Sequence, residues 1–269
     1  MNAEQNPPNI PQAWLRTPLG EYFLAWEQAC LDAILTDIFG YNALQIGLAD
    51  QDLLRANRIP LHVCARRAPG QSDESAPASR VTVLTDEAAL PFVSASFDLV
   101  VLAHALEFSD YPHQILREAE RILVPGGSVV VCGFNPFSLW GLRSRCSRGH
   151  GQWPWSGRYL SASKLRDWLT LFGFEVQSGC FGCYVPPVDV PEWLARWKWL
   201  DHVGRRCWLV CGAVWMLHGI KRVSGVRLIQ PNWRDKCIRA KSFPVAVRRV
   251  GEIGEINEIS EKTGKTWKS

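Results

Sequence analysis

The sequence has no apolar run that is long enough to cross a membrane. Its longest apolar stretch, Cys207–Leu217, covers 11 residues, whereas a membrane-spanning helix needs about 20. The first twelve residues, MNAEQNPPNIPQ, also lack the basic and apolar regions of a secretory signal peptide. These two absences predict a cytoplasmic protein.

The nine cysteines lack the regular spacing of a disulfide framework. We therefore expect reduced thiols, as in most cytoplasmic proteins. The closest pair, Cys180 and Cys183, could form a zinc site with Cys207 and Cys211, but the spacing is loose for zinc. Because buried cysteines are common in protein cores, we predict no metal site.

The sequence also lacks a dense block of like charges, although its charge is uneven. Residues 1–139 hold 8 Lys/Arg and 16 Asp/Glu, and residues 140–250 hold 19 and 6. A basic half can attract phosphates, nucleic acid or an anionic membrane, and mutual attraction between the two halves explains the same pattern. We expect no nucleic-acid partner; a membrane surface remains an alternative to the small-molecule partner that we favour.

The periodicity of the apolar residues predicts alternating helices and strands. Residues 18–39 carry apolar side chains at helical spacing and precede Gly40, and a short helix is predicted within residues 50–57. The other predicted helices span residues 112–123 and 161–172. Short apolar runs predict strands at 42–47, 61–65, 81–84, 97–102, 128–133, 173–176 and 207–221.

This alternation is typical of a parallel sheet, because parallel neighbours need a crossover connection. One domain is predicted over residues 13–230, with an irregular insert at 134–160 and a lid-like segment at 181–206. Residues 1–12 and 231–269 lack periodicity, and we expect them to form a disordered start and a loose tail.

A series of short motifs between Asp86 and Asn135 resembles the type-11 group of class I S-adenosylmethionine-dependent methyltransferases. The motifs are Asp86, Leu90-Pro91-Phe92, Ser96-Phe97-Asp98, His104-Ala105-Leu106-Glu107, Arg117-Glu118 and Leu123 to Gly127. A weaker resemblance extends over residues 43–221. The opening, Thr17-Pro-Leu-Gly20 through Trp26-Glu27-Gln28, is similar to a bacterial subgroup of these proteins.

The resemblance implies an α/β fold: a Rossmann-like, doubly wound, mostly parallel sheet with flanking helices and a C-terminal antiparallel edge strand. Ligands of open parallel sheets bind outside the carboxyl ends of the strands. The resemblance implies that Asp86 binds the adenine amino group with Glu87 beside it, and that His104 lies near the methyl donor. A helix N-cap or a solvated loop acid for Asp86 and a packing role for His104 are the alternatives.

The first strand departs from the family pattern, acidic-x-Gly-x-Gly-x-Gly. The corresponding positions here are Gln45, Gly47, Ala49 and Gln51. Glycines at these positions let the backbone turn and approach a ligand. We still expect Gln45, Gly47 and Ala49 in the cofactor site. Residues 62–67, at the end of the second strand, hold no acid for the ribose hydroxyls, so the resemblance is weakest here.

An aromatic and basic helix is predicted at residues 191–206, with Trp193, Trp197 and Trp199 among its side chains. It suits a lid over a substrate pocket, an interfacial membrane helix or a protein contact, and we predict the lid, because both ends are tied to the sheet. Candidates for the acceptor pocket are Asn135, Trp140 and Tyr159.

The leading functional hypothesis is therefore methyl transfer from S-adenosylmethionine to a small molecule. Such an enzyme mainly aligns the donor and the acceptor, because the cofactor carries the reactivity. The sequence accordingly identifies no catalytic residue. The rival hypothesis is a catalytically inactive, methyltransferase-like protein that binds an anionic partner or a membrane surface.

Overall fold

A mixed sheet runs through the computed structural model, which describes residues 12–66, 80–147, 153–197, 199–207 and 211–222. Within these residues, the strands are β1 (Asn42–Ile46), β2 (Leu61–Arg66), β3 (Arg80–Leu84), β4 (Phe97–Ala103), β5 (Leu123–Phe134), β6 (Phe174–Gly182) and β7 (Val214–Lys221). The helices are α1 (Gln12–Leu15), α2 (Pro18–Leu35), α3 (Pro112–Ile122), α4 (Leu139–Cys146), α5 (Ala162–Leu171), α6 (Pro191–Trp197) and α7 (Trp199–Cys207). The described residues belong to one compact unit, residues 1–225.

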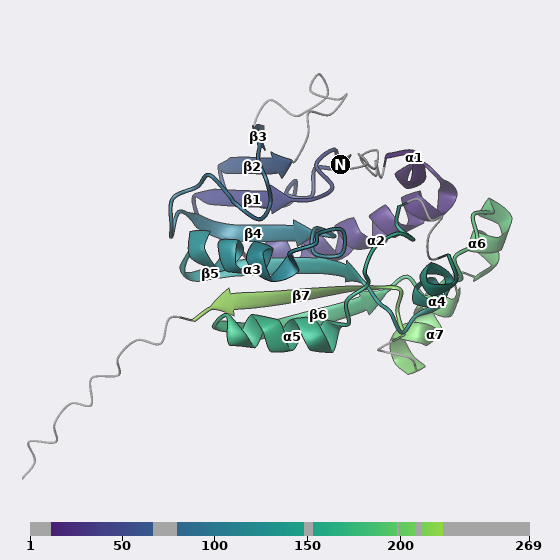
Figure 1. The fold of residues 1–269 in the computed structure, drawn as a ribbon. Helices are drawn as coiled ribbons and strands as arrows, with labels where there is room; N and C mark the ends of the chain where they lie inside the picture. The colour runs from purple at the N-terminus through teal and green to yellow at the C-terminus, as the bar shows by residue number, and fades with distance from the viewer. Residues whose placement is uncertain (1–11, 67–79, 148–152, 198, 208–210, 223–269) are drawn as a thin grey trace, which may run out of the picture. The chain divides into compact units, whose positions relative to one another are not determined.

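The strand order is β3-β2-β1-β4-β5-β7-β6 (Figure 1). Neighbouring strands from β3 to β5 pair in parallel, and β7 pairs antiparallel with both β5 and β6. This confirms the doubly wound, mostly parallel sheet and the antiparallel C-terminal strand. β7 lies between β5 and β6, so the antiparallel β6–β7 pair closes this side of the sheet.

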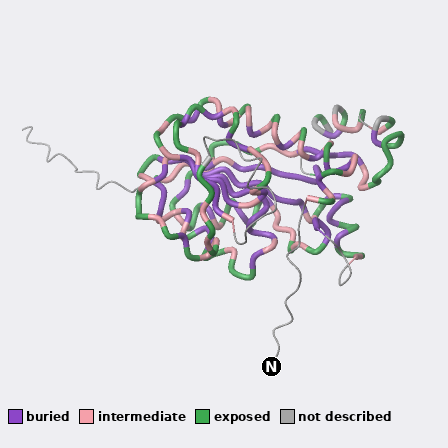
Figure 2. The backbone as a smooth tube through the Cα atoms, turned by 90° about the horizontal axis from the view of Figure 1, so that it is seen from above, coloured by how far each residue is buried: buried purple, intermediate pink, exposed green. Residues whose placement is uncertain are grey.

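The helices cover both faces of the sheet. Buried side chains of α2 pack in one apolar cluster with Val101 and Phe134, and those of α3 and α5 pack in a second cluster with Val100 and Val131. Consecutive residues of β4 and β5 therefore face opposite layers, which explains why both strands are apolar without interruption. Figure 2 shows these buried strands at the centre of the chain, between more exposed helices.

Three helices begin at hydroxyl caps. The side chains of Thr17, Ser138 and Ser161 accept hydrogen bonds from backbone N–H groups in the first turns of α2, α4 and α5. The cap at Ser138 creates a helix inside the segment 134–160, so the prediction of a wholly irregular insert is wrong. These caps fix the positions at which the three helices leave the loops.

The connection between β1 and β2 holds turns where a helix was predicted. Asn57 donates hydrogen bonds to the carbonyl oxygens of Leu35 and Ile38, at 2.7 and 3.0 Å, and accepts one from the backbone of Ile59. Side chains that bind backbone groups in this way compete with helix formation. The periodicity of residues 50–57 does not reveal such contacts.

Other boundaries also differ from the prediction. α2 ends at Leu35, the segment 191–206 forms two helices, α6 and α7, and the last strand begins at Val214. The expected disordered start and loose tail fall almost entirely outside the described residues. Within the described residues, no helix is both long and apolar enough to cross a membrane.

One cysteine pair corrects the expectation of reduced thiols. A disulfide joins Cys30 on α2 to Cys180 on β6, and it links positions 150 residues apart. Free thiols among the described residues are those of Cys64, Cys132, Cys146, Cys183 and Cys211. The disulfide therefore links α2 covalently to the edge of the sheet.

Gly47 and Gly126 provide a matched test of the packing after β1. Both have positive φ angles, 83° and 82°, but a Cβ at Gly47 would lie 2.0 Å from the carbonyl oxygen of Ala103, whereas one at Gly126 meets nothing within 4 Å. We expect Gly126→Ala to lower the free energy of unfolding by about 1 kcal/mol, and Gly47→Ala to lower it by at least about 2 kcal/mol more through the clash. Urea unfolding measures both, and equal losses would contradict the close approach of β1 and β4.

Candidate functional site

The carboxyl ends of β1, β2 and β4 meet where the strand order changes direction. β1 lies between β2 and β4, and its chain turns at Gly47 against the carbonyl oxygen of Ala103. Ligands of open parallel sheets bind at this switch point. Figure 1 shows α1, α4 and α6 at the same end of the sheet, so these elements surround the candidate site.

Gln45 organises the loop that follows β1. Its side chain is fully buried. The amide nitrogen donates to the carbonyl oxygens of Gly47, Leu48 and Gln51, and the amide oxygen accepts from the backbone of Leu53 at 3.3 Å. A carboxylate cannot donate these bonds, which explains the amide at this position. Gln45 thus supports the loop from behind, and the backbone of Gly47 stands at the switch point itself.

A carboxylate does stand beside the end of β2, although β2 does not supply it. Asp50, in the loop after β1, pairs with Arg66 at 3.0 Å and accepts a hydrogen bond from Gln12 at 2.6 Å. Arg66 is the last residue of β2. Ala49, which precedes the acid, is half-buried and lies close to Cys64 of β2. Asp50 was not among the predicted site residues, although it lies inside the degenerate glycine motif, between Ala49 and Gln51.

Asp86 and Glu87 lie directly after β3. The exposed carboxylate of Asp86 accepts a hydrogen bond from the backbone of Ala88 at 3.1 Å, and Asp86 forms an isolated bridge with Ala89. Glu87 is half-buried. The carboxylate of Asp86 therefore stabilises its own turn, and no helix begins there. This turn lies at the sheet edge where the resemblance places the adenine.

His104 lies between two buried carboxylates. Its Nδ1 atom is 3.0 Å from Oε2 of Glu107, and its Nε2 atom is 3.3 Å from Oε1 of Glu27. The three side chains are at most 3% exposed. His104 also has a φ angle of 55°, in a region that non-glycine residues rarely adopt and that often marks a functional site. α2 provides Glu27, and the turn after β4 provides the other two.

These carboxylates determine the charge of the imidazole. Burial disfavours the charged ring, but Glu27 and Glu107 outweigh this effect and raise the pKa of His104 to about 10. Burial also raises the pKa of Glu107 and, well above its usual range, that of the neighbouring Cys132 thiol. His104 therefore carries its proton at neutral pH, and Cys132 remains a thiol.

Aromatic rings enclose this cluster. The ring centroid of His104 lies 4.2 Å from that of Phe134, 5.3 Å from that of Phe23 and 6.3 Å from that of Trp153. Tyr159 stacks on Phe134 at 5.1 Å, and burial raises the pKa of its hydroxyl. The cluster is therefore shielded from bulk water, where its electrostatic interactions would be weaker.

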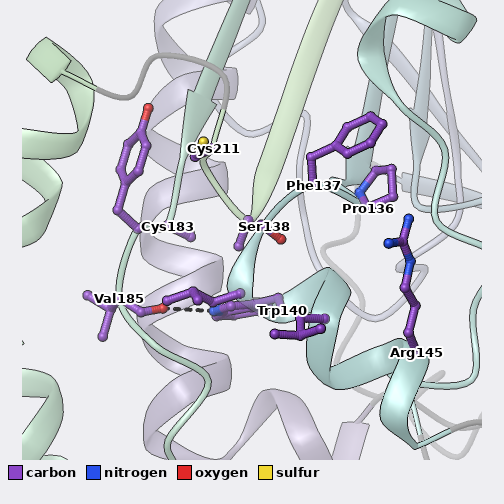
Figure 3. Close-up of a pocket in the computed structure, with 12 residues that line it drawn as sticks. Pro136, Phe137, Ser138, Trp140, Arg145, Cys183, Val185 and Cys211 are labelled. Carbon is purple, nitrogen blue, oxygen red and sulfur yellow. Dashed lines mark hydrogen bonds between the residues drawn. The ribbon is translucent and has the colours of Figure 1, made fainter.

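The acceptor-pocket candidates occupy three different positions. Trp140 is fully buried, donates a hydrogen bond to the carbonyl oxygen of Val185 at 2.8 Å and lines a cavity of about 410 Å³ (Figure 3). Asn135 holds the loop before α4, since its amide binds the backbones of Gly212 and Phe137. Tyr159 belongs to the aromatic wall around His104. Only Trp140 of the three is among the described residues that line this cavity.

The tryptophans of α6 and α7 do not all face the core. Trp193 and Trp199 are 51% and 55% exposed, and Trp197 is the one that packs against the apolar core. No described residue of 191–206 lines the cavity. Two of the three tryptophans in the predicted lid segment therefore lie at the surface.

Glu27 could have been identified from the sequence. It lies four residues after Phe23 and four before Leu31, and all three side chains are fully buried on one face of α2. A carboxylate on the apolar face of an amphipathic helix requires a charged or hydrogen-bonding partner. The sequence does not reveal that the partner is His104, because 77 residues separate the two.

Comparison with known proteins identifies the domain type. A family model described as "Methyltransferase domain" matches residues 60–131. The uncharacterized protein YafS of Escherichia coli is 33% identical over 62% of this chain and 66% of its own length. The uncharacterized protein Rv2003c of Mycobacterium tuberculosis is 31% identical over 65% of this chain and 61% of its own. The chain thus spans slightly less than two thirds of these relatives.

Solved structures share the fold at low sequence identity. An S-adenosylmethionine-dependent methyltransferase from Thermotoga maritima, described as a possible histamine N-methyltransferase, has a TM-score of 0.61 and 17% identity over 78% of this chain and 94% of its own. A putative methyltransferase in complex with the Haloferax volcanii activator Trm112 has a TM-score of 0.58 and 16% identity, covering 80% and 97%. The [4+2]-cyclase SpnF has a TM-score of 0.52 and 18% identity, covering 73% and 80%, so this fold alone does not determine the reaction.

The buried His104 and the half-buried His218 should titrate far apart. We expect the ring signals of His104 to remain those of the protonated form up to about pH 10, whereas burial lowers the pKa of His218 below its usual 6.5. NMR titration of the histidine rings measures both, and Glu27→Gln should lower only the pKa of His104. Because the folded-state pKa of His104 is raised, its contribution to stability is complete below pH 6.5 and disappears as the pH rises to about 10. A His104 signal that titrates near pH 6.5 would contradict the carboxylate contacts.

Proposed function

Since the chain belongs to the type-11 group of class I methyltransferases, we propose that it is an S-adenosylmethionine-dependent enzyme that methylates a small molecule. The observation that carries this proposal is the row of carboxylates at successive strand ends. Asp86 follows β3, and Asp50 stands beside the end of β2. The adenine amino group and the ribose hydroxyls are hydrogen-bond donors, which match these acceptors.

The residues at the switch point fit the rest of such a ligand. Gly47 lets the backbone turn where a Cβ has no space, and the buried carboxylates of Glu27 and Glu107 stand beside the end of β4. Acidic groups favour a cationic ligand at this position, and the methyl donor is a sulfonium. The bound cofactor would supply the electrophilic methyl group, while the chain orients it and excludes water.

His104 has a positioning role in this proposal. Because its pKa is raised to about 10, the ring holds its proton at neutral pH and does not act as a general base there. Its Nδ1 then donates a hydrogen bond to Glu107 and its Nε2 lies within ion-pair distance of Glu27, and these contacts favour fixed orientations of both carboxylates. The imidazolium thereby keeps two acidic side chains buried beside the ligand position. A carboxylate buried there without a cationic partner would instead take up a proton and become neutral.

Two observations favour the rival, a methyltransferase-like protein that binds a partner without catalysis. In many dinucleotide-binding sites, a helix begins after the first strand and its N-terminus faces the ligand. No helix follows β1 among the described residues, so this contact is absent there. In addition, the ion pair with Arg66 occupies the Asp50 carboxylate. Ligand binding therefore has to be tested before turnover.

S-Adenosylhomocysteine is the probe for the cofactor side. We expect it to bind the folded protein, and at about 100 times its dissociation constant to stabilise the fold by about 2.7 kcal/mol. Asp86→Asn and Asp50→Asn should each weaken binding by about 1–2 kcal/mol, the effect of losing one acceptor in a polar contact. Calorimetric titration measures the affinities, and Asp167→Asn, an exposed change on α5, is the matched control.

The outcome separates the two functions. If the native protein shows neither heat nor a shift in melting temperature, the enzyme proposal fails and the binding-protein rival gains support. If it binds with unchanged affinity after both substitutions, the cofactor lies elsewhere than at these strand ends. Unfolding curves of the variants exclude a loss of fold as the cause.

A further inference from the structure

The cavity beside Trp140 has an apolar interior. Its volume of about 410 Å³ is in the range of small-molecule sites. Most of its walls are apolar or aromatic, and they come from the loop before α4, from α4 itself, from the chain after β6 and from the chain before β7. The described lining residues are Pro136, Phe137, Ser138, Leu139, Trp140, Leu142, Arg145, Cys183, Tyr184, Val185, Cys211 and Ala213.

One cation stands in this apolar wall. Arg145 is the only charged residue among the described residues that line the cavity. Figure 3 shows its side chain beside Pro136 and Phe137, across the cavity from Cys183 and Cys211. The N-terminal end of α4, at Leu139 and Trp140, lines the same cavity, and the positive end of a helix dipole also favours an anion.

The two arginines of α4 differ in their contacts. Arg143 packs over the ring of Trp155 with its guanidinium carbon 4.4 Å from the ring centroid, and it donates to the carbonyl oxygen of Pro187. Arg145 has no ion pair or hydrogen bond with any described residue. Arg143 therefore stabilises the fold, whereas Arg145 has donors for a ligand.

Aromatic rings in contact connect the cavity with the buried cluster around His104. Trp140 lines the cavity and its ring centroid lies 6.1 Å from that of Phe134 and 6.4 Å from that of Phe23. Both of these rings contact His104. A molecule in the cavity is thus separated from His104, at the carboxyl end of β4, by two successive rings, Trp140 and then Phe134 or Phe23.

We propose that this cavity binds an amphipathic anion, with its apolar body against Trp140, Leu142 and Val185 and its anionic group on the guanidinium of Arg145. The inference deepens the proposed function, on which it rests, by assigning the chemical class of the methyl acceptor. Phe137, Leu139 and Leu142 are 66%, 52% and 59% exposed at the rim, and they extend the apolar surface along which such a molecule enters.

A pair of fluorescent probes tests the charge preference. 1-Anilinonaphthalene-8-sulfonate is an amphipathic anion, and N-phenyl-1-naphthylamine carries the same rings without the sulfonate. We expect Arg145→Gln to weaken sulfonate binding about threefold to tenfold. The effect should not be larger, because Arg145 is exposed at the rim and water screens its interaction with the sulfonate. The affinity for the uncharged probe should not change, and Arg145→Lys should retain most of the sulfonate affinity.

Two further variants locate the binding site. Cys211→Phe places a larger side chain in the cavity wall from an exposed position, and we expect it to weaken both probes. Arg166→Gln, on the exposed face of α5, removes an arginine elsewhere and should affect neither. If Arg145→Gln leaves the sulfonate affinity unchanged, or if Cys211→Phe weakens neither probe, the proposal is overturned; unchanged melting temperatures exclude misfolding.

The same measurements keep the two proposals apart, because the probes are titrated without cofactor. If Arg145→Gln leaves the sulfonate affinity unchanged while the native protein binds S-adenosylhomocysteine, only the proposal of an amphipathic anion is contradicted. The opposite result contradicts only the enzyme. Sedimentation with phosphatidylcholine vesicles, with and without phosphatidylglycerol, then distinguishes the sources of the ligand. Retention at ~150 mM salt that Arg145→Gln abolishes identifies a bilayer lipid, and no retention identifies a free amphiphile.

Discussion

The protonated imidazole of His104 is buried between two carboxylates, and this arrangement requires α2 and the turn after β4 to keep their relative positions. An ion pair in the interior is costly when one partner is missing, because the remaining charge has no water around it. Glu27 comes from α2, and His104 and Glu107 come from the turn after β4, so this cost ties the first helix to the switch point of the sheet. The disulfide between Cys30 and Cys180 holds the next turn of α2 to β6. The aromatic rings of Phe23 and Phe134 fill the remaining space.

The loop after β1 follows from a second constraint, the packing of Gly47 against Ala103. With the backbone fixed there, the chain reaches β2 through turns, and the buried amide of Gln45 satisfies three carbonyl oxygens of the loop. An acid at this position would bury a charge and lose those bonds. The amide of Gln45 and the turns that follow β1 are therefore one arrangement. Asp50, displaced to the end of β2 by the same turns, provides the carboxylate that β2 lacks.

The strands were predictable from the sequence, because uninterrupted apolar runs such as residues 97–102 record burial on both faces. Apolar runs do not record the strand order, and the doubly wound arrangement was implied only by the family resemblance. The motif around His104 and Glu107 also placed these residues correctly at the end of a strand. Apolar periodicity does not record side chains that bind backbone groups, so it missed the turns built by Gln45 and Asn57 and the helix capped by Ser138. It also does not identify partners that are distant in sequence, which is why the pairing of Glu27 with His104 and that of Asp50 with Arg66 appear only in the structure.

The positions of the buried cluster and the cavity constrain how a methyl group could pass between them. Transfer requires the donor carbon and the acceptor atom in contact, yet Trp140 and Phe134 separate the end of β4 from the cavity. The indole of Trp140 is held by its hydrogen bond to the carbonyl oxygen of Val185. Val185 lies in the chain after β6, between the disulfide at Cys180 and the start of α6. If both proposals hold, an acceptor that enters the cavity has to displace this indole to reach the methyl donor. The path between them opens when the hydrogen bond from Trp140 to Val185 breaks.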